Sequence, residues 1–164
     1  MMKSSSIEPD VKLRYFLKPS SIEPDVELRD FLKGKISVGT ADGGTQEVAV
    51  YSDWERPTNE LPTDFIVIYI NGNIESVGMD TPFARGYLMV SLYCKMNDDG
   101  SVKKNRIKRI LAKFDELIEK HLTENYHYEY EPQRFITPTT PNQTSGYSVT
   151  TLNLRWTTNS NFNS

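Results

Sequence analysis

The chain has a single cysteine, two histidines and no long hydrophobic run. Cys94 has no second cysteine to pair with, and on the apolar face of a strand it is expected to be a small buried residue in a reducing compartment. No stretch of about 18 apolar residues is present, which excludes a transmembrane helix. The N-terminus lacks the apolar segment of a signal peptide. We therefore expect a soluble protein made in a cytoplasm, without contact to a membrane.

Recognisable catalytic and cofactor-binding motifs are also missing. There is no P-loop, no GxGxxG and no GxSxG, and His121 and His127 are expected on different elements without zinc-ligand spacing. His127, Glu129 and Glu131 place three possible ligands on one strand face, although a solvated strand face ordinarily has this composition. Residues 98–100 (DDG) lack the rest of a calcium-binding loop. We expect no catalytic residues, no cofactor and no metal site.

Length and charge favour one domain that does not primarily bind nucleic acid. The 164 residues are enough for one domain with a sizeable core. The formal net charge is -3, whereas dedicated nucleic-acid binders are usually basic.

One stretch in the middle of the chain combines a strand, an acidic turn and a long helix. Residues 86–96 alternate as a strand with one apolar face, because side chains alternate with period two. Residues 101–121 repeat apolar side chains at three- and four-residue steps, which predicts an amphipathic helix. The two apolar faces are expected to be buried together. The strand face comprises Leu88, Val90, Leu92, Cys94 and Met96, and the helix stripe comprises Ile107, Ile110, Leu111, Phe114, Leu117, Ile118 and Leu122.

The N-terminus contains a tandem duplication. Residues 5–18 (SSIEPDVKLRYFLK) recur as residues 20–33 (SSIEPDVELRDFLK) with two differences. The second copy predicts a short helix over about 24–33, with proline at its start and Gly34 after its end. Either one copy docks and the other is spare, or the first copy is an arm that docks on a neighbouring subunit. The contact residues of that arm would be Leu13, Phe16 and Leu17.

The remaining elements complete an α+β pattern. Strands are predicted at 47–52, 64–72, 125–135 and 147–156; the second of these is apolar on both faces and therefore central. Asn71-Gly72-Asn73 predicts a turn, with a short returning strand to Val77. Residues 39–46, 53–63 and 136–146 are predicted loops. Trp54, in the second loop, is either an exposed anchor for a partner or packs on its own core.

We therefore predict an antiparallel sheet of about four to five strands, packed by one long helix (about 101–121) and the short N-terminal helix. The domain is expected to span 20–158, with 1–19 as a duplicated arm and 159–164 as a frayed tail.

The long helix has an unusual order of charges. Basic residues occupy its first half and acidic residues its second half, whereas the helix dipole favours the reverse. A basic half that local electrostatics does not favour suggests contact with an acidic partner or with phosphates; a solvated face of mixed charge is the alternative. The basic residues are Lys103, Lys104, Arg106, Lys108, Arg109 and Lys113.

The order of these elements resembles the tail terminator, or tail completion, proteins of long-tailed bacteriophages. The resemblance lies in PTDFIVIYING, ARGYLMVSLYCKMNDDGSVKKNRIKRILAKFDELI and SGYSVTTLNLRW, which together cover most of residues 47–157. It is a resemblance of pattern, and the duplicated N-terminus departs from it.

The resemblance implies a virion protein of the tail-neck region, assembled in the host cytoplasm. Such subunits form a hexameric ring that caps the tail tube, ends its growth and presents a surface to the head-tail connector, with DNA passing only through the lumen. Trp54, the first repeat copy and the loop 136–146 would then supply the patches that contact neighbouring subunits. The basic half of the helix would line the lumen or meet an acidic neighbour. The alternatives are another neck or head-tail joining component, a small enzyme with a site made of scattered residues, or a protein that stacks single-stranded nucleic acid on its tyrosines.

Overall fold

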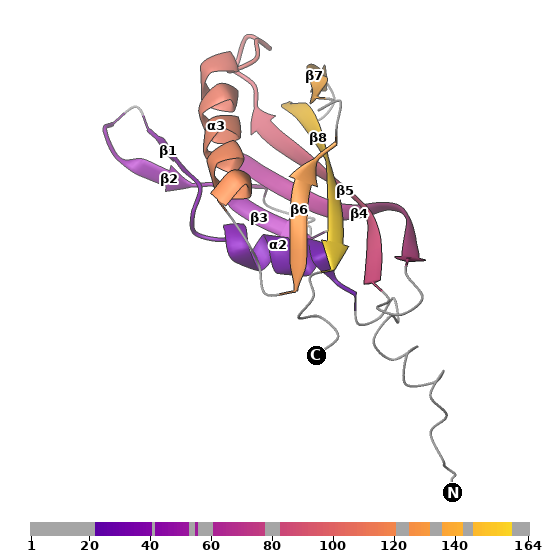
Figure 1. Ribbon diagram of the computed structural model, residues 1–164. Coiled ribbons are helices and arrows are strands. Elements are labelled where there is room, and N and C mark those ends of the chain that lie inside the picture. Colours follow the sequence, from indigo (N-terminus) through magenta and orange to yellow (C-terminus); the bar gives the residue numbers. More distant parts are fainter. Residues whose placement is uncertain are drawn as a thin grey trace, which may run out of the picture.

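The computed structural model describes residues 22–40, 42–52, 55, 61–77, 83–120, 125–131, 136–142 and 146–158. The predicted arm 1–19, the frayed tail 159–164 and Trp54 lie outside these residues. The described part is an α+β unit with two helices, α2 (Pro24–Leu32) and α3 (Lys104–Lys120), and one large sheet (Figure 1). A small hairpin of β1 (Ser37–Gly39) and β2 (Thr45–Glu47) connects α2 to the large sheet.

The large sheet is mixed, so the prediction of an antiparallel sheet is only partly right. Its strand order is β3 (Ala49–Ser52), β4 (Asp64–Val77), β5 (Phe83–Lys95), β8 (Tyr147–Thr158) and β6 (Tyr126–Tyr130). Strands β3 and β4 are parallel, and the other pairs along this order are antiparallel. Parallel neighbours require a long connection, which the chain supplies between Ser52 and Asp64. Sequence alternation predicts a strand but carries no information on the direction of its pairing.

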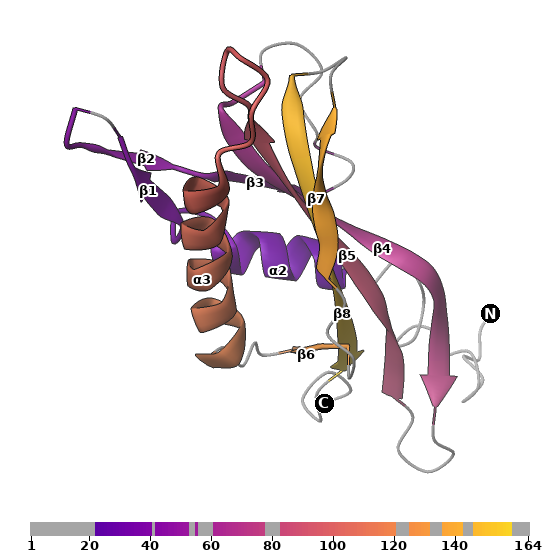
Figure 2. The same cartoon turned by 90° about the horizontal axis from the view of Figure 1, so that it is seen from above.

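Both helices lie on the same side of the sheet (Figure 2). The even-numbered residues of the central strands face the helices, and they join the apolar stripe of α3 and the buried side of α2 in one core. The predicted burial of strand 86–96 with the long helix is therefore confirmed. This core includes Ile66, Ile68, Leu88, Val90, Leu92, Leu152, Leu154 and Trp156 from the sheet, and Leu28, Leu32, Ile107, Ile110, Phe114 and Ile118 from the helices.

Strand β4 continues through the segment that was predicted to turn. Asn71 pairs with Tyr87 and Glu75 pairs with Arg85, so residues 72–74 of β4 lie opposite the single residue Gly86 of β5. Gly72 has φ 81°, which glycine adopts without steric cost. The Asn-Gly signal therefore marks a bulge in a long strand instead of a hairpin turn.

A further correction concerns residues 136–146, which were predicted as a loop. Residues Ile136–Asn142 form β7, which pairs antiparallel with the first half of β8, whereas β6 pairs with its second half. The register shifts between Thr137 and Thr140, and Pro141 lies opposite Ser148. A strand that pairs on one side only tolerates proline, because it needs to donate few ladder hydrogen bonds.

The predicted loop 39–46 is in part the β1–β2 hairpin. Gly39 pairs with Thr45, and the tip is closed by the backbone of Thr40, which accepts a bond from Gly43 and donates one to Gly44. The hairpin projects beside α3 (Figures 1 and 2). This position brings the hairpin within reach of Arg106 of that helix.

Candidate functional site

The face of the large sheet that points away from the helices carries no helix among the described residues. We call it the open face; it is formed by the odd-numbered residues of β3, β4, β5 and β8 and by His127 and Glu129 of β6, as the strand registers require. Its two ends differ in chemistry. One end is aromatic and partly buried, and the other end is charged and exposed.

The aromatic end centres on Phe65, which is buried. The rings of Tyr51, Tyr93 and Tyr147 surround it, with centroid distances of 6.2, 4.7 and 5.7 Å. The Tyr147 hydroxyl donates to the carbonyl oxygen of Pro62 at 2.7 Å. These contacts form a second, smaller core together with Val67. The aromatic end therefore contributes to folding through packing of apolar surface.

The charged end lies where β4, β5, β8 and β6 run side by side. Arg85 of β5 pairs with Glu75 of β4 at 2.9 Å, and Arg155 of β8 pairs with Glu129 of β6. Tyr87 lies opposite Arg155 in the register, two residues along β5 from Arg85, and is 45% exposed. These residues border a depression of about 380 Å³, which is lined by Asn73, Glu75, Arg85, Gly86, Tyr87, Glu129, Arg155, Trp156 and Thr157.

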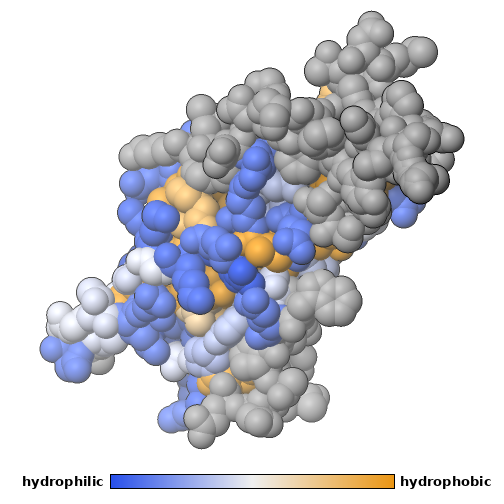
Figure 3. Space-filling view, turned by 90° about the horizontal axis from the view of Figure 1, so that it is seen from below, coloured by the Kyte–Doolittle hydropathy of each residue, from blue (hydrophilic) through white to orange (hydrophobic). Residues whose placement is uncertain are grey.

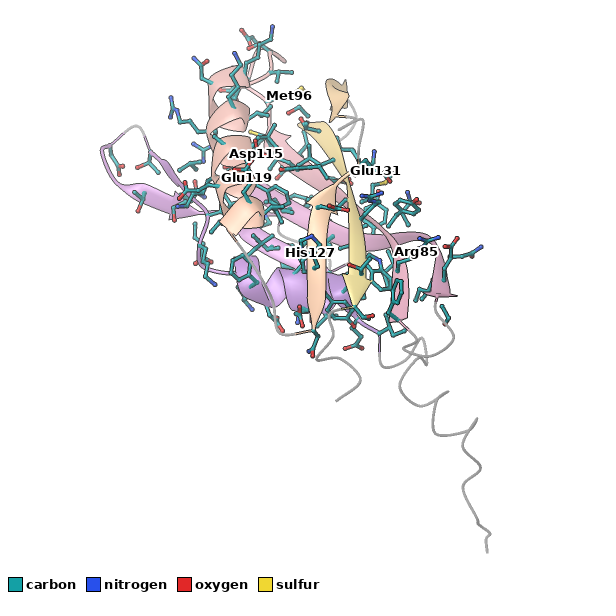
Figure 4. The ribbon with its side chains drawn as sticks, in the orientation of Figure 1. Arg85, Met96, Asp115, Glu119, His127 and Glu131 are labelled. Carbon is teal, nitrogen blue, oxygen red and sulfur yellow. The ribbon has the colours of Figure 1, made fainter. Side chains whose placement is uncertain are left out.

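The register explains why these side chains meet. Arg85, Thr157 and His127 form one row across β5, β8 and β6, and Tyr87, Arg155 and Glu129 form the next row. Figure 4 labels Arg85 on β5 and His127 on β6, on either side of β8. His127 Nε2 lies 3.9 Å from a Glu129 carboxylate oxygen, within the same strand.

An exposed tyrosine beside two arginine–carboxylate pairs has the composition of a protein interface. Tyrosine and arginine are enriched where proteins bind one another, because they combine a large apolar area with polar ends. Exposed ion pairs contribute little to the stability of a single chain, typically about 0–1 kcal/mol. Their orientation can instead select a partner of complementary charge.

The basic residues singled out in the long helix do not form one group. Lys104, Lys108 and Arg109 are exposed, and Lys103 is half-buried just before the helix. Lys113 Nζ lies 3.6 Å from a Glu116 carboxylate oxygen. Figure 4 shows side chains of α3 projecting outward from the sheet.

Arg106 has a different role from its basic neighbours. Its Nε and Nη2 donate to Oδ2 of the buried Asp64 at 2.8 and 2.5 Å, and this hydrogen bond raises the pKa of the guanidinium. Arg106 is therefore a structural link between α3 and β4. A surface formed by the long helix has to be built from Lys104, Lys108 and Arg109 instead.

The alternation predicted for residues 125–135 is confirmed over β6, with consequences for nucleic-acid binding. Tyr126 and Tyr128 are buried on the helix side, and the Tyr130 hydroxyl donates to Asp115 of α3. Figure 4 labels Asp115 on α3. Buried or engaged rings cannot stack on bases, so β6 offers no stacking platform of the kind that single-strand binders use.

Two further features of the sequence are Cys94 and the possible ligands His127, Glu129 and Glu131, for which no metal site is expected. Cys94 is buried, and burial together with the neighbouring Asp64 carboxylate raises the pKa of its thiol to about 12. Within the described part of the chain, no group of three or more histidine, cysteine, aspartate or glutamate side chains is arranged to hold a metal ion. Glu129 is instead engaged with Arg155 and His127.

The charged end of the open face was missed from sequence alone. The signal was present: odd positions of the segment 83–95 include Arg85 and Tyr87, whereas even positions are apolar or small. The missing information was the register, which brings Arg85 and Tyr87 beside Arg155, about seventy positions later.

Comparisons with known proteins add no identification. Neither a scan against protein-family models nor a search of curated proteins found a match to this chain. None of the helices in the described ranges has the length and apolar character needed to cross a membrane.

Proposed function

We propose that this chain is a structural subunit of the tail-neck region of a long-tailed bacteriophage or prophage, of the tail terminator type. The subunits assemble in the host cytoplasm into a ring, most simply a hexamer, which caps the tail tube and ends its elongation. The ring then presents a surface to the head-tail connector, and DNA passes through its lumen. The pattern of the strands and the long helix supports this proposal.

The observation that carries the proposal is the sheet with both described helices on one face. At one end of its open face Tyr87 lies beside two arginine–carboxylate pairs, whereas the exposed cations Lys104, Lys108 and Arg109 belong to α3 on the opposite face. A ring built from one kind of subunit needs two different patches on each subunit, one for each neighbour or partner. The chain offers two such patches, on opposite sides and of different chemistry.

The mass of the purified protein in solution tests the ring. Light scattering across a range of concentrations should give a closed oligomer, and Tyr87→Ala should lower the mass, since it removes the central exposed ring of the patch. Leu61→Ala is the matched control, because Leu61 is similarly exposed (42%) at the other end of β4. A monomer at every concentration, or an equal effect of both variants, would contradict the proposal.

The position in the particle requires a second experiment. Negative-stain images of the protein mixed with tail tubes should show density at one tube end. Binding to the head connector but not to tubes would favour the alternative of a head-tail joining component. The triple variant Lys104→Glu, Lys108→Glu and Arg109→Glu should reduce binding to tube or connector while Arg106 keeps the fold intact; unchanged virion yield would show that this surface has no role.

A further inference from the structure

The second repeat copy binds a defined surface formed by β3, β4 and β6, which we call the α2-binding surface. The Tyr126 hydroxyl accepts a hydrogen bond from the backbone N–H of Glu23 at 2.9 Å, and the Tyr128 hydroxyl donates to the carbonyl oxygen of Pro24 at 2.8 Å. These bonds hold the start of α2 at positions more than a hundred residues away in sequence. Figure 3 shows the outer surface of the molecule on the side where α2 lies in Figure 1, and hydrophobic and hydrophilic residues are intermixed on it.

Apolar contacts complete this binding. The core side chains of α2, and that of Ile22 two residues before the helix, share the side that faces the sheet. They are Ile22, Leu28 and Leu32, each at most 1% exposed, with Phe31 packed against them. Asp25 is also buried, in the first turn of the helix.

Every one of these contact positions is repeated in residues 5–18. Fifteen positions earlier, the chain has the same residue at each contact: Ile7, Glu8, Pro9, Asp10, Leu13, Phe16 and Leu17. The two bonds to the tyrosines use backbone atoms of Glu23 and Pro24, and both residues recur as Glu8 and Pro9. The first copy therefore carries every buried side chain and both backbone groups through which the second copy contacts the α2-binding surface.

Of the two differences, one lies on the exposed side of the helix and the other at the edge of the buried contacts. Asp30, which is Tyr15 in the first copy, has a side chain that is 62% exposed and pairs with Arg29. Glu27, which is Lys12 in the first copy, is half-buried and accepts a long 3.4 Å bond from the Tyr128 hydroxyl. Both changes remove peripheral polar contacts and leave the apolar side intact.

We propose that residues 5–18 can replace residues 20–33 on the α2-binding surface of the same chain. The chain would slip by fifteen residues, and residues 19–33 would form a loop leading to β1. Such a loop is tolerated, because the entropy cost of closing a loop grows slowly with its length. One surface with two tethered occupants favours exchange within the chain, since a tethered segment has a high effective concentration. This inference does not depend on the proposed function.

The helix ends decide which copy is preferred. After the second copy comes Gly34 with φ 79°, a conformation that leads the chain directly into the hairpin. After the first copy comes Pro19, whose ring fixes φ near -65° and cannot reproduce that turn. The second copy is therefore the main occupant, and the first copy is the reserve that binds when the second is weakened.

Matched alanine variants test the exchange. Leu13→Ala should leave the urea midpoint of unfolding unchanged, because the second copy is bound. Leu28→Ala should lower the midpoint only moderately, because the first copy takes the place of the second. The double variant Leu13→Ala/Leu28→Ala should lower the midpoint clearly further. Hydrogen exchange followed by mass spectrometry should show that Leu28→Ala moves protection from residues 20–33 to residues 5–18.

Equal midpoints for Leu28→Ala and the double variant, without new protection of residues 5–18, would overturn the proposal. Should the double variant not fold, the milder pair Phe31→Ala and Phe16→Ala gives the same comparison. The measurements are made at two protein concentrations. If the midpoint of Leu28→Ala rises with protein concentration, the segment on the α2-binding surface comes from a second chain. That result would refute exchange within one chain.

Discussion

Arg106 of α3 and Asp64 at the start of β4 form an ion pair in which both Nε and Nη2 donate to the same carboxylate oxygen. The carboxylate side chain is 1% exposed, and that of Arg106 is 17% exposed. The guanidinium also reaches the β1–β2 hairpin, with Nη2 3.2 Å from Oε1 of Gln46 and Nη1 3.4 Å from the carbonyl oxygen of Gly39. One side chain thus connects the long helix, the sheet and the hairpin.

Removal of the arginine should be costly. Arg106→Ala leaves the Asp64 carboxylate buried without its cation, and such a loss typically costs about 3–5 kcal/mol. Lys104→Ala, on the exposed side of the same helix, should change stability by less than about 0.5 kcal/mol. Urea unfolding of both variants measures the difference, and a loss no greater than that of Lys104→Ala would show that the pair is not needed for stability.

Gly86 should not tolerate a side chain. A Cβ at this position would lie 2.8 Å from Cζ2 of Trp156, whose ring is fully buried and stacks edge-on against Tyr126. We expect Gly86→Ala to destabilise the fold by about 1–3 kcal/mol through overpacking and to change the near-ultraviolet circular dichroism of the tryptophan. Gly39→Ala is the control, since its Cβ would meet no atom closer than 4.0 Å. Equal stability of the two variants would contradict this role of Gly86.

The stability of the fold should depend on the ionisation of Asp25. Burial raises the pKa of Asp25 above its usual 3.8, and the backbone N–H groups of Val26 and of Asp25 itself oppose this only in part. The folded state therefore holds the proton more tightly than the unfolded state, so stability falls as the pH rises through this pKa. Asp25→Asn should accordingly stabilise the protein at pH 7, and the gain should shrink toward pH 4. A gain that is equal at both pH values, or absent, would argue against the inference.

Cys94 should be inert in the folded protein. Its thiol is buried and its pKa is raised to about 12, so little of the reactive thiolate forms at pH 8. A thiol reagent at pH 8 should label Cys94 slowly in the native state and rapidly in denaturant. Rapid native labelling would show that the site opens to solvent.

The elements with strong periodicity were predictable, and their partners were not. The stripe of the long helix and the alternation of β5 and β6 follow from the spacing of apolar residues, and the structure confirms them. The bulge at Gly72 was not predicted, because a glycine after asparagine suits both a turn and a bulge. Strand β7 was not predicted either, because threonine and proline are typical of loops, and only the pairing with β8 makes this segment a strand. Arg106 was grouped with surface lysines since nothing in the sequence links it to Asp64.

The sequence by itself determined which side of α2, α3 and β5 is apolar, and it showed that the segment docked as α2 exists twice. Only the tertiary structure decided which strands are neighbours, that β3 runs parallel to β4, and that Arg85, Tyr87 and Arg155 meet on an open face. The physical reason is the distance in sequence over which each property is set. Burial of a periodic face is a local property of the chain, whereas register and ion pairing join residues that are far apart in sequence without a repeating pattern.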